Sequence, residues 1–327
     1  MAGTVVVTFK LGERHRREIA DILGGSGEPV YLTDLADGER AQALSAASVV
    51  LARNTGKELQ PHETGLLGNA RLIQFMTAGV DYIPLHQLPP GVPIACNGGA
   101  YAEMMAEHAL AMALALAKRL LVEHGALARG EFNQFTPNKM LAGGVFGVFG
   151  FGGIGIVTAR LMRGFGMRIH AINRRGASDE PTDWIGKPAD LDTLLAEADV
   201  LLISTPLTRL TTGAIGAREL GLMKPDAILL NLARGEVVDE AALYAHLLAK
   251  PRFSAGIDAW WVEPVRHDTF RMDFPFTDLP NVIGSPHNSA SSDRSLTVAL
   301  GRAVDNCRRV LTGEQARNLI GADERAG

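Results

Sequence analysis

The chain has 327 residues, 46% apolar and 21% charged, which is long enough for two domains with large cores and typical of a soluble globular protein. The net charge of −4, without a basic block to offset it, argues against nucleic-acid binding. The longest apolar run of the central helical segment, residues 109–117, is too short to span a bilayer.

The N-terminal segment and the cysteines indicate a cytoplasmic protein. The chain enters an apolar strand at residues 5–7 without a signal-peptide pattern. Its two cysteines, Cys96 and Cys307, offer neither a disulfide framework nor metal-ligand spacing. We therefore expect a cytoplasmic location, no bound metal, and neither nucleic acid nor membrane as a partner.

The first 98 residues alternate short strands with helical segments, which predicts a parallel sheet with helices on both faces. The expected strands are residues 4–9, 30–32, 48–52, 72–76 and 93–96, and the expected helices are residues 14–23 and 39–45. The loop Thr77-Ala78-Gly79-Val80-Asp81 follows a strand and could offer backbone N–H groups to an anion. A plain turn ended by an Asp helix cap is an equally good interpretation of this loop.

Residues 100–123 form one long, Ala- and Met-rich helical pattern that is apolar around most of its circumference. Both faces of such a helix should be buried, one against its own domain and one against a second subunit. Glu107 and His108 are its polar exceptions, and we interpret them as structural hydrogen-bonding groups.

A glycine motif then follows the apolar strand at residues 145–149. Gly150, Gly152 and Gly155 have the G-x-G-x-x-G spacing, and a helical pattern continues from residue 156. A strand, a tight turn and a helix start in this order are typical of a Rossmann domain, which binds a dinucleotide pyrophosphate at the helix N-terminus. We expect Gly153 and Ile154 to contribute to the same turn. Chance spacing is the alternative, since the chain has 36 glycines.

The next strand, residues 167–172, ends at Asn173, Arg174 and Arg175. An NAD enzyme usually has Asp or Glu here, which binds the ribose 2′-hydroxyl and would repel a 2′-phosphate. A guanidinium can instead bind a 2′-phosphate with two hydrogen bonds. The sequence therefore favours NADP as the cofactor, with NAD less favoured; a solvated loop is the alternative interpretation of the two arginines.

Further strands are expected at residues 200–204, 227–231, 253–257 and 281–284. A helix is expected at residues 190–198, before the first of these strands, and a terminal helix at residues 292–311 should return to the first domain. The loops that follow these strands should line the cofactor. Their candidate cofactor-binding residues are Thr205, Pro206, Thr211, Leu232, Ala233 and Asp258.

Three ionisable residues lie just past strand ends in this domain: Arg234, Glu263 and His287. A doubly wound sheet carries out its chemistry at that edge. Arg can bind a carboxylate and polarise a carbonyl, His can exchange a proton near neutral pH, and Glu can orient the imidazole. Each residue alone could form a surface salt bridge or helix cap, but the three together predict a catalytic group.

Several segments in this order resemble the D-isomer-specific 2-hydroxyacid dehydrogenases, over nearly the whole chain. They are Ala106-Glu-His-Ala109, Gly150-Phe-Gly-Gly-Ile-Gly155, Asn231-Leu-Ala-Arg-Gly-Glu-Val-Val-Asp-Glu240, Asp258-Ala-Trp-Trp-Val-Glu-Pro264 and Ser285-Pro-His287. The resemblance implies an α/β protein with two doubly wound parallel-sheet domains, a Rossmann coenzyme domain inserted into a flavodoxin-like substrate domain. It places the substrate domain at residues 1–98 and 288–327, the coenzyme domain at 99–287, and a homodimer interface at helix 100–123.

The resemblance also implies roles for residues. Arg234 would hold the substrate carboxylate and carbonyl, His287 would be the acid/base, and Glu263 would be its partner. Asn54 and the backbone amides of Ala78, Gly79 and Val80 would bind the substrate. Independently of the resemblance, we expect Asp258 to anchor the nicotinamide amide, because its strand end should face the ring half of the cofactor.

This chain departs from patterns found in the family at several places. Asn173-Arg174 replaces the acid of NAD-using members, and Trp260-Trp261 stands where many members have Phe and a polar residue. The Lys of phosphite-oxidising relatives and the Gln of formate-oxidising relatives have no equivalent that we can identify. We therefore expect a reductase of a small 2-oxo acid such as glyoxylate or hydroxypyruvate. A nucleotide-sensing, corepressor-like binding protein on the same fold is the alternative.

Overall fold

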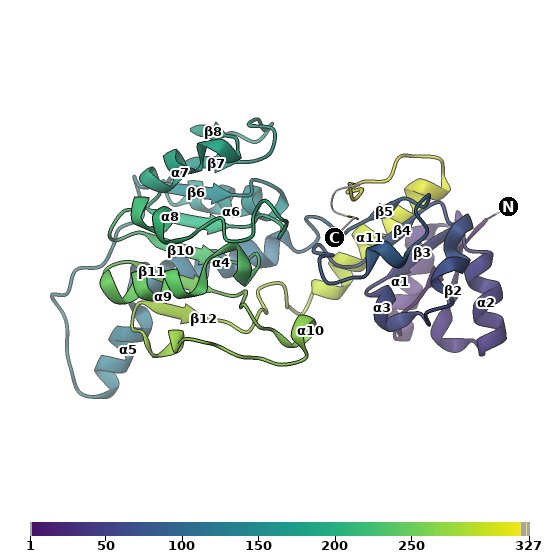
Figure 1. Cartoon of the computed structure of the whole chain (residues 1–327), viewed down its shortest axis with the longest axis horizontal. Helices are drawn as coiled ribbons and strands as arrows, with labels where there is room; N and C mark the ends of the chain where they lie inside the picture. The colour runs from purple at the N-terminus through teal and green to yellow at the C-terminus, as the bar shows by residue number, and fades with distance from the viewer. Residues whose placement is uncertain (1, 322–324, 326–327) are drawn as a thin grey trace. The chain divides into compact units, whose positions relative to one another are not determined.

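The computed structural model describes residues 2–321 and 325, which form two compact units. Unit 1 combines Met1–Tyr101 with Ser292–Gly327, and unit 2 is Ala102–Ser291. These limits lie three and four residues from the boundaries expected at 98/99 and 287/288. Figure 1 shows that the C-terminal helix α11 (Ser295–Leu311) lies among the elements of the N-terminal segment.

Unit 1 is a five-stranded parallel sheet with the order β2-β1-β3-β4-β5. This is the flavodoxin-like order that the resemblance implied. Its strands are β1 (Gly3–Val7), β2 (Gly27–Tyr31), β3 (Val49–Ala52), β4 (Ile73–Phe75) and β5 (Ile94–Ala95). Its other helices are α1 (Glu13–Leu23), α2 (Asp37–Ser45) and α3 (Thr55–Glu58), with short 3₁₀ turns at Leu32–Asp34, Thr64–Asn69 and Leu85–Gln87.

Alternation along the strands builds two cores in unit 1. Val5 and Val7 are buried in one cluster with residues of α1 and α11, whereas Val6 belongs to a second cluster with Leu44 of α2. Successive strand residues point to opposite faces, so a run of valines buries both faces of the sheet. The parallel sheet with helices on both sides, predicted from the sequence, is confirmed.

Unit 2 is a seven-stranded parallel sheet with the order β12-β11-β10-β9-β6-β7-β8. Counted from β6, this is the Rossmann order 3-2-1-4-5-6 with one added strand. The strands are β6 (Val145–Phe149), β7 (Arg168–Ile172), β8 (Trp184–Gly186), β9 (Val200–Ile203), β10 (Ile228–Asn231), β11 (Ser254–Ile257) and β12 (Val282–Gly284). The helices are α4 (Ala102–Ala117), α5 (Leu120–Ala128), α6 (Gly153–Gly164), α7 (Leu191–Glu197), α8 (Ala217–Leu222), α9 (Glu240–Ala249) and α10 (Pro264–His267), with 3₁₀ turns at Pro188–Asp190, Gly235–Val237 and Phe276–Asp278.

The register of this sheet aligns the carboxyl ends of its strands. Phe149 pairs with Ile172 and Ile203, Asn231 pairs with Ile203 and Ile257, and Ile257 pairs with Gly284. The residues that follow these strands therefore share one edge of the sheet. They are Gly150, Asn173, Ser204, Leu232, Asp258 and Ser285.

The single helix expected at residues 100–123 is wrong, because the structure has two helices. Helix α4 ends at Ala117, and Arg119 adopts a left-handed conformation with φ of 51° before α5 begins. The returning chain satisfies the end of α4: the Lys139 N–H donates to the Ala117 carbonyl and Lys118 Nζ donates to the Lys139 carbonyl. No Gly or Pro marks this break, so the helical pattern of the sequence continues through it.

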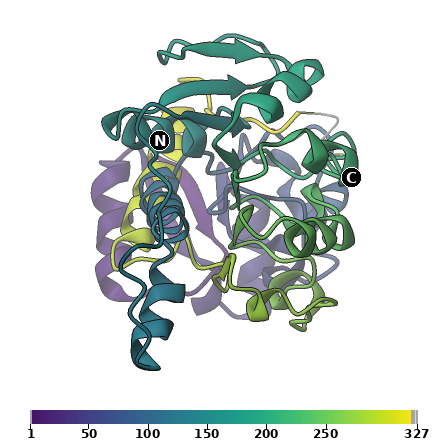
Figure 2. The same cartoon turned by 90° about the vertical axis from the view of Figure 1, so that its left-hand side faces the viewer.

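Helix α5 and the chain after it form an arm, residues 118–140, that projects from the rest of unit 2 in both views (Figures 1 and 2). In contrast, α4 packs against α6 and against strands β10 and β11. Among residues 2–321 and 325, no helix is both long and apolar enough to cross a bilayer.

Candidate active site

The glycine turn after β6 has the geometry of a pyrophosphate cradle. Gly150 has φ of 107°, and a Cβ there would collide with the backbone of Thr205. A Cβ on Gly152 would meet no described atom within 4 Å, so its backbone is open to a ligand. A Cβ on Gly155 would lie 2.7 Å from Val148 Cγ1, so this glycine lets α6 pack against β6. Helix α6 begins at Gly153, so Gly153, Ile154 and Gly155 present first-turn N–H groups.

The Asn173 side chain builds the turn after β7. Its Oδ1 accepts the N–H groups of Arg175 and Gly176 at 3.0 and 2.8 Å, and its Nδ2 donates to the Ala177 carbonyl. Arg174 and Arg175 are exposed on this turn. Lys187 adds a third cation, because its side chain lies against Gly176, where a Cβ would be 2.8 Å from Lys187 Cγ. The sequence did not point to Lys187, since the short strand β8 before it was not predicted.

Hydrogen bonds join residues within the loop after β9 and join this loop to the glycine turn. Ser204 Oγ donates to the Gly150 carbonyl at 3.0 Å, which joins two strand ends. Thr211 Oγ1 donates to the Pro206 carbonyl at 2.7 Å and accepts the Thr208 N–H at 2.8 Å. Thr205, Pro206 and Thr211 thus belong to one folded loop beside the glycine turn, and their contact with the cofactor stays a prediction.

The segment after β10 positions Arg234. Leu232 and Ala233 are buried, and Asn231 uses its side chain to hold the turn: Oδ1 accepts the Ala233 N–H, and Nδ2 donates to the Arg234 carbonyl at 2.9 Å. Arg234 Nη1 donates to the Ala233 carbonyl at 2.8 Å. These bonds explain why the last residue of β10 is an asparagine.

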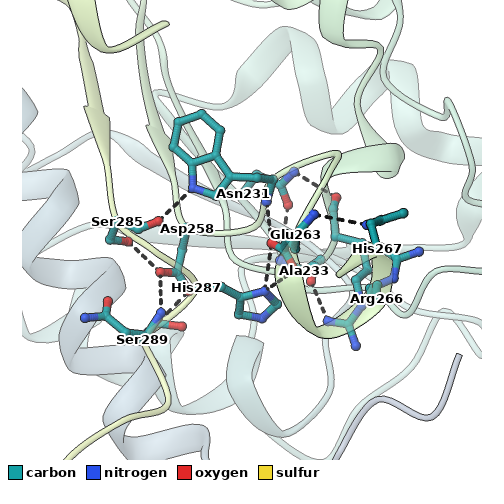
Figure 3. Close-up of polar contacts among 12 residues, drawn as sticks. Asn231, Ala233, Asp258, Glu263, Arg266, His267, Ser285, His287 and Ser289 are labelled. Atoms are coloured by element: carbon teal, nitrogen blue, oxygen red, sulfur yellow. Dashed lines mark hydrogen bonds and ion pairs between the residues drawn. The ribbon is translucent and has the colours of Figure 1, made fainter. Parts of the chain in front are cut away.

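Glu263 and His287 lie together (Figure 3). His287 Nδ1 is 2.9 Å from Glu263 Oε1 and 2.8 Å from Oε2. The Glu263 carboxylate also accepts the Trp260 backbone N–H at 2.6 Å. Glu263 is 5% exposed, whereas the His287 side chain is 33% exposed. A buried carboxylate therefore holds one ring nitrogen of an imidazole that solvent can still reach.

The surroundings of Glu263 favour its charged form. Burial raises the pKa of this carboxyl, but the hydrogen bond and charge of His287, the Trp260 N–H and the charge of Arg234 outweigh burial, so that the net pKa lies below its usual value. The three residues singled out from the sequence thus interact electrostatically within unit 2.

Asp258 holds the loop that carries His287. Its buried carboxylate accepts Ser285 Oγ and the Asn288 N–H on Oδ1 and the Ser289 N–H on Oδ2. His108 Nε2 lies 2.9 Å from Ser285 Oγ, which confirms a structural hydrogen bond for this histidine. Glu107 is exposed on α4. The role of Asp258 as an anchor for the nicotinamide amide stays a prediction.

The residues expected to bind substrate from unit 1 lie after β3 and β4. Asn54 Oδ1 accepts the Gly56 N–H at 3.0 Å and caps α3. Ala78, Gly79 and Val80 are half-buried in the loop after β4, and the Val80 carbonyl accepts the Ile83 N–H. Their contacts with substrate stay predictions.

Comparison with known proteins identifies the family. The family model described as "D-isomer specific 2-hydroxyacid dehydrogenase, NAD binding domain" matches residues 110–289. Glyoxylate/hydroxypyruvate reductase B of Pectobacterium carotovorum subsp. carotovorum (strain PC1) is 35% identical over 223 residues, covering 67% of this chain and 68% of that protein. Hydroxypyruvate reductase of Thermotoga maritima is 32% identical over 227 residues, covering 68% and 72%.

A solved structure agrees with these sequence matches. The glycerate dehydrogenase related protein from Thermoplasma acidophilum superposes with a TM-score of 0.65 at 29% identity, covering 94% of this chain and 99% of that one. The resemblance inferred from the sequence motifs is confirmed, and so is the prediction of an enzyme. The chain therefore belongs to the D-isomer-specific 2-hydroxyacid dehydrogenase family and is an NAD(P)-dependent oxidoreductase of that family.

Proposed function

We propose that this enzyme uses NADPH to reduce a small 2-oxo acid, such as glyoxylate or hydroxypyruvate, to the D-2-hydroxy acid. The observation that carries the proposal is the pair of His287 Nδ1 and Glu263, 2.8 Å apart, on the sheet edge that also carries Arg234 and the glycine turn. An acid/base, a carboxylate-binding cation and a nucleotide cradle are the groups that such a reduction requires.

Different residues bind the substrate, stabilise its developing charge and donate the proton. A bound nicotinamide supplies the hydride. Arg234 binds the substrate carboxylate with its planar fork and stabilises negative charge on the carbonyl oxygen. Because Glu263 occupies Nδ1, His287 donates the proton from Nε2. Asn54 and the backbone amides of Ala78, Gly79 and Val80 are our further candidates for substrate binding.

Three features support NADPH over NADH. Asn173 is neutral and is occupied in building its own turn, so no carboxylate at this position repels a 2′-phosphate. Arg174 and Arg175 are exposed on the same turn. Lys187 lies against Gly176 and adds positive charge to it. Hydrogen bonds from positively charged side chains to a phosphate are strong, so cations on this turn favour a cofactor with a 2′-phosphate.

Two features support a small 2-oxo acid as substrate. The relatives from Pectobacterium and Thermotoga are named reductases of glyoxylate or hydroxypyruvate. A 2-oxo acid has a carboxylate next to a carbonyl group. Arg234 can bind the carboxylate, and His287 can protonate the carbonyl oxygen.

The arm at residues 118–140 supports a homodimer. Leu120, Leu121, Phe132, Phe135 and Met140 are all more than half exposed, and Phe135 is 90% exposed. Apolar side chains gathered on a projecting segment are typical of an interface, so we assign the arm to contacts with a second copy. A cytoplasmic location stays a prediction.

A screen tests the proposal. Oxidation of NADPH and of NADH is followed with glyoxylate, hydroxypyruvate, pyruvate and a branched 2-oxo acid, with the His287→Gln variant as control for background oxidation. We expect the highest kcat/KM with NADPH and one of the two small acids. Turnover of none of the acids, with NADPH still bound, would favour the nucleotide-sensing alternative.

A further inference from the structure

Trp260 contacts Glu263 and the loop that carries His287, although no role follows for it from the proposed chemistry. Its backbone N–H donates to Glu263 Oε1 at 2.6 Å. Its indole Nε1 donates to the Ser285 carbonyl at 2.8 Å, two residues before His287. The side chain is 4% exposed, so it is held almost entirely by protein.

The Ser285 carbonyl is a shared acceptor. It also receives the backbone N–H of His287 at 3.0 Å. The indole restrains this carbonyl. The carbonyl in turn restrains the backbone of His287 through the His287 N–H.

The backbone of His287 requires such restraint. Its φ is 48°, in the left-handed region that residues other than glycine rarely occupy because it is strained. A conformation of this kind persists only where several contacts impose it. The carbonyl and carboxylate of Asp258 provide some of these contacts, to the N–H groups of residues 287–289, and the indole provides another.

The indole is itself fixed by its neighbours. It lies against the backbone of Gly284, where a Cβ would be 2.8 Å from Trp260 Cζ2. Phe270 packs edge-to-face on it, with ring centroids 5.8 Å apart. The backbone of Gly235, next to Arg234, packs against the backbone of Trp260 so closely that a Cβ there would collide with it. One residue thus touches the segments that carry Arg234, Glu263 and His287.

We propose that Trp260 is a positioning residue: its indole N–H fixes the Ser285 carbonyl, which holds the His287 backbone so that Nδ1 stays on Glu263. The proposal rests on the function proposed above. A phenylalanine at this position would keep an aromatic ring but would lack the donor. Without the donor, the imidazole leaves Glu263 for part of the time, and only the remaining fraction of molecules can transfer the proton.

The test compares Trp260→Phe with Trp261→Phe. Trp261 is a matched control, because its indole also donates to a backbone carbonyl, that of Val238 at 2.7 Å, away from the His287 loop. We expect Trp260→Phe to lower kcat on the order of 3- to 10-fold, the usual effect of one lost hydrogen bond, with KM for NADPH unchanged. The pH at which reductive activity falls by half should move down. Trp261→Phe should keep kcat and this pH midpoint within about twofold and a few tenths of a unit of wild type.

Two further measurements keep the test decisive. Replacing Trp260 with 3-benzothienylalanine keeps the shape of the ring and removes only the donor, so it should reproduce the effect of Trp260→Phe if that variant folds poorly. The imidazole ¹H–¹⁵N resonance of His287, assigned with His287→Gln, should show loss of the Nδ1 hydrogen bond in both Trp260 variants and not in Trp261→Phe. This resonance reports on the pair even if no 2-oxo acid is reduced. Wild-type resonances and pH profile in both Trp260 variants, or an equal loss in Trp261→Phe, would overturn the proposal.

Discussion

Replacement of Glu263 by Gln should change the pH dependence of reduction. The variant keeps the size of the side chain and removes its negative charge from Nδ1 of His287, 2.8 Å away. Reduction needs the protonated imidazole, so activity falls as the pH rises. The Glu263 carboxylate stabilises the positive charge of that ring, so its loss should lower kcat, most strongly at the higher pH values of the profile.

The size of the effect can be estimated from the geometry. A hydrogen bond between charged groups contributes about 1.5–3 kcal/mol. We take the lower end, because the His287 side chain is 33% exposed and solvent screens the pair. At 1.36 kcal/mol for each tenfold change in rate, kcat of the variant should fall by about tenfold. The pKa of Glu263 lies below its usual value, so the wild-type carboxylate stays charged at neutral pH.

The assay is kcat against pH for wild type and Glu263→Gln with one responsive 2-oxo acid. Glu236→Gln is the control: Glu236 pairs with Arg266 at 2.7 Å in the same unit, and its loss should leave kcat and its pH profile unchanged. Superimposable profiles for wild type and Glu263→Gln would refute the reasoning, as would an equal loss in the control.

Other predictions concern the remaining groups. His287→Gln should lower kcat by roughly 10²–10⁴-fold while NADPH binding, measured by fluorescence titration, survives; Arg234→Lys keeps the charge but loses the planar fork, so kcat/KM for 2-oxo acids should fall strongly in the same assay. Wild type should prefer NADPH to NADH by about tenfold or more, and the double variant Asn173→Asp with Arg174→Ala should reverse this preference; equal use of both cofactors by wild type would rule out the 2′-phosphate assignment. Light scattering should show a dimer at micromolar concentration, and a monomer would exclude a role of the arm at residues 118–140 in assembly.

The sequence predicted those parts of the molecule that depend on local pattern. Apolar strand runs and the glycine spacing placed both sheets, and parallel pairing then put Gly150, Asp258 and Ser285 on one edge. Glu263 and His287 were expected as partners because each follows a strand at that edge. Their separation could not be predicted, since it depends on how the loops after β11 and β12 fold.

The parts that sequence reasoning missed depend on contacts between distant residues. Helix α4 ends at Ala117, whose carbonyl accepts the N–H of the distant Lys139, and no local residue signals this contact. Strand β8 is three residues long, too short for a periodic pattern. The left-handed backbone of His287 is imposed by Asp258 and Trp260, which lie more than 25 residues earlier in the chain.

Transfer of deuterium tests the central claim most directly. The enzyme is incubated with hydroxypyruvate and NADPH that carries deuterium at both C4 positions, and the product is analysed by mass spectrometry and chiral chromatography. Direct hydride transfer to the carbonyl carbon, with proton donation to its oxygen by His287, predicts D-glycerate with one deuterium at C2. Glycerate without deuterium, or the L isomer, would contradict the account.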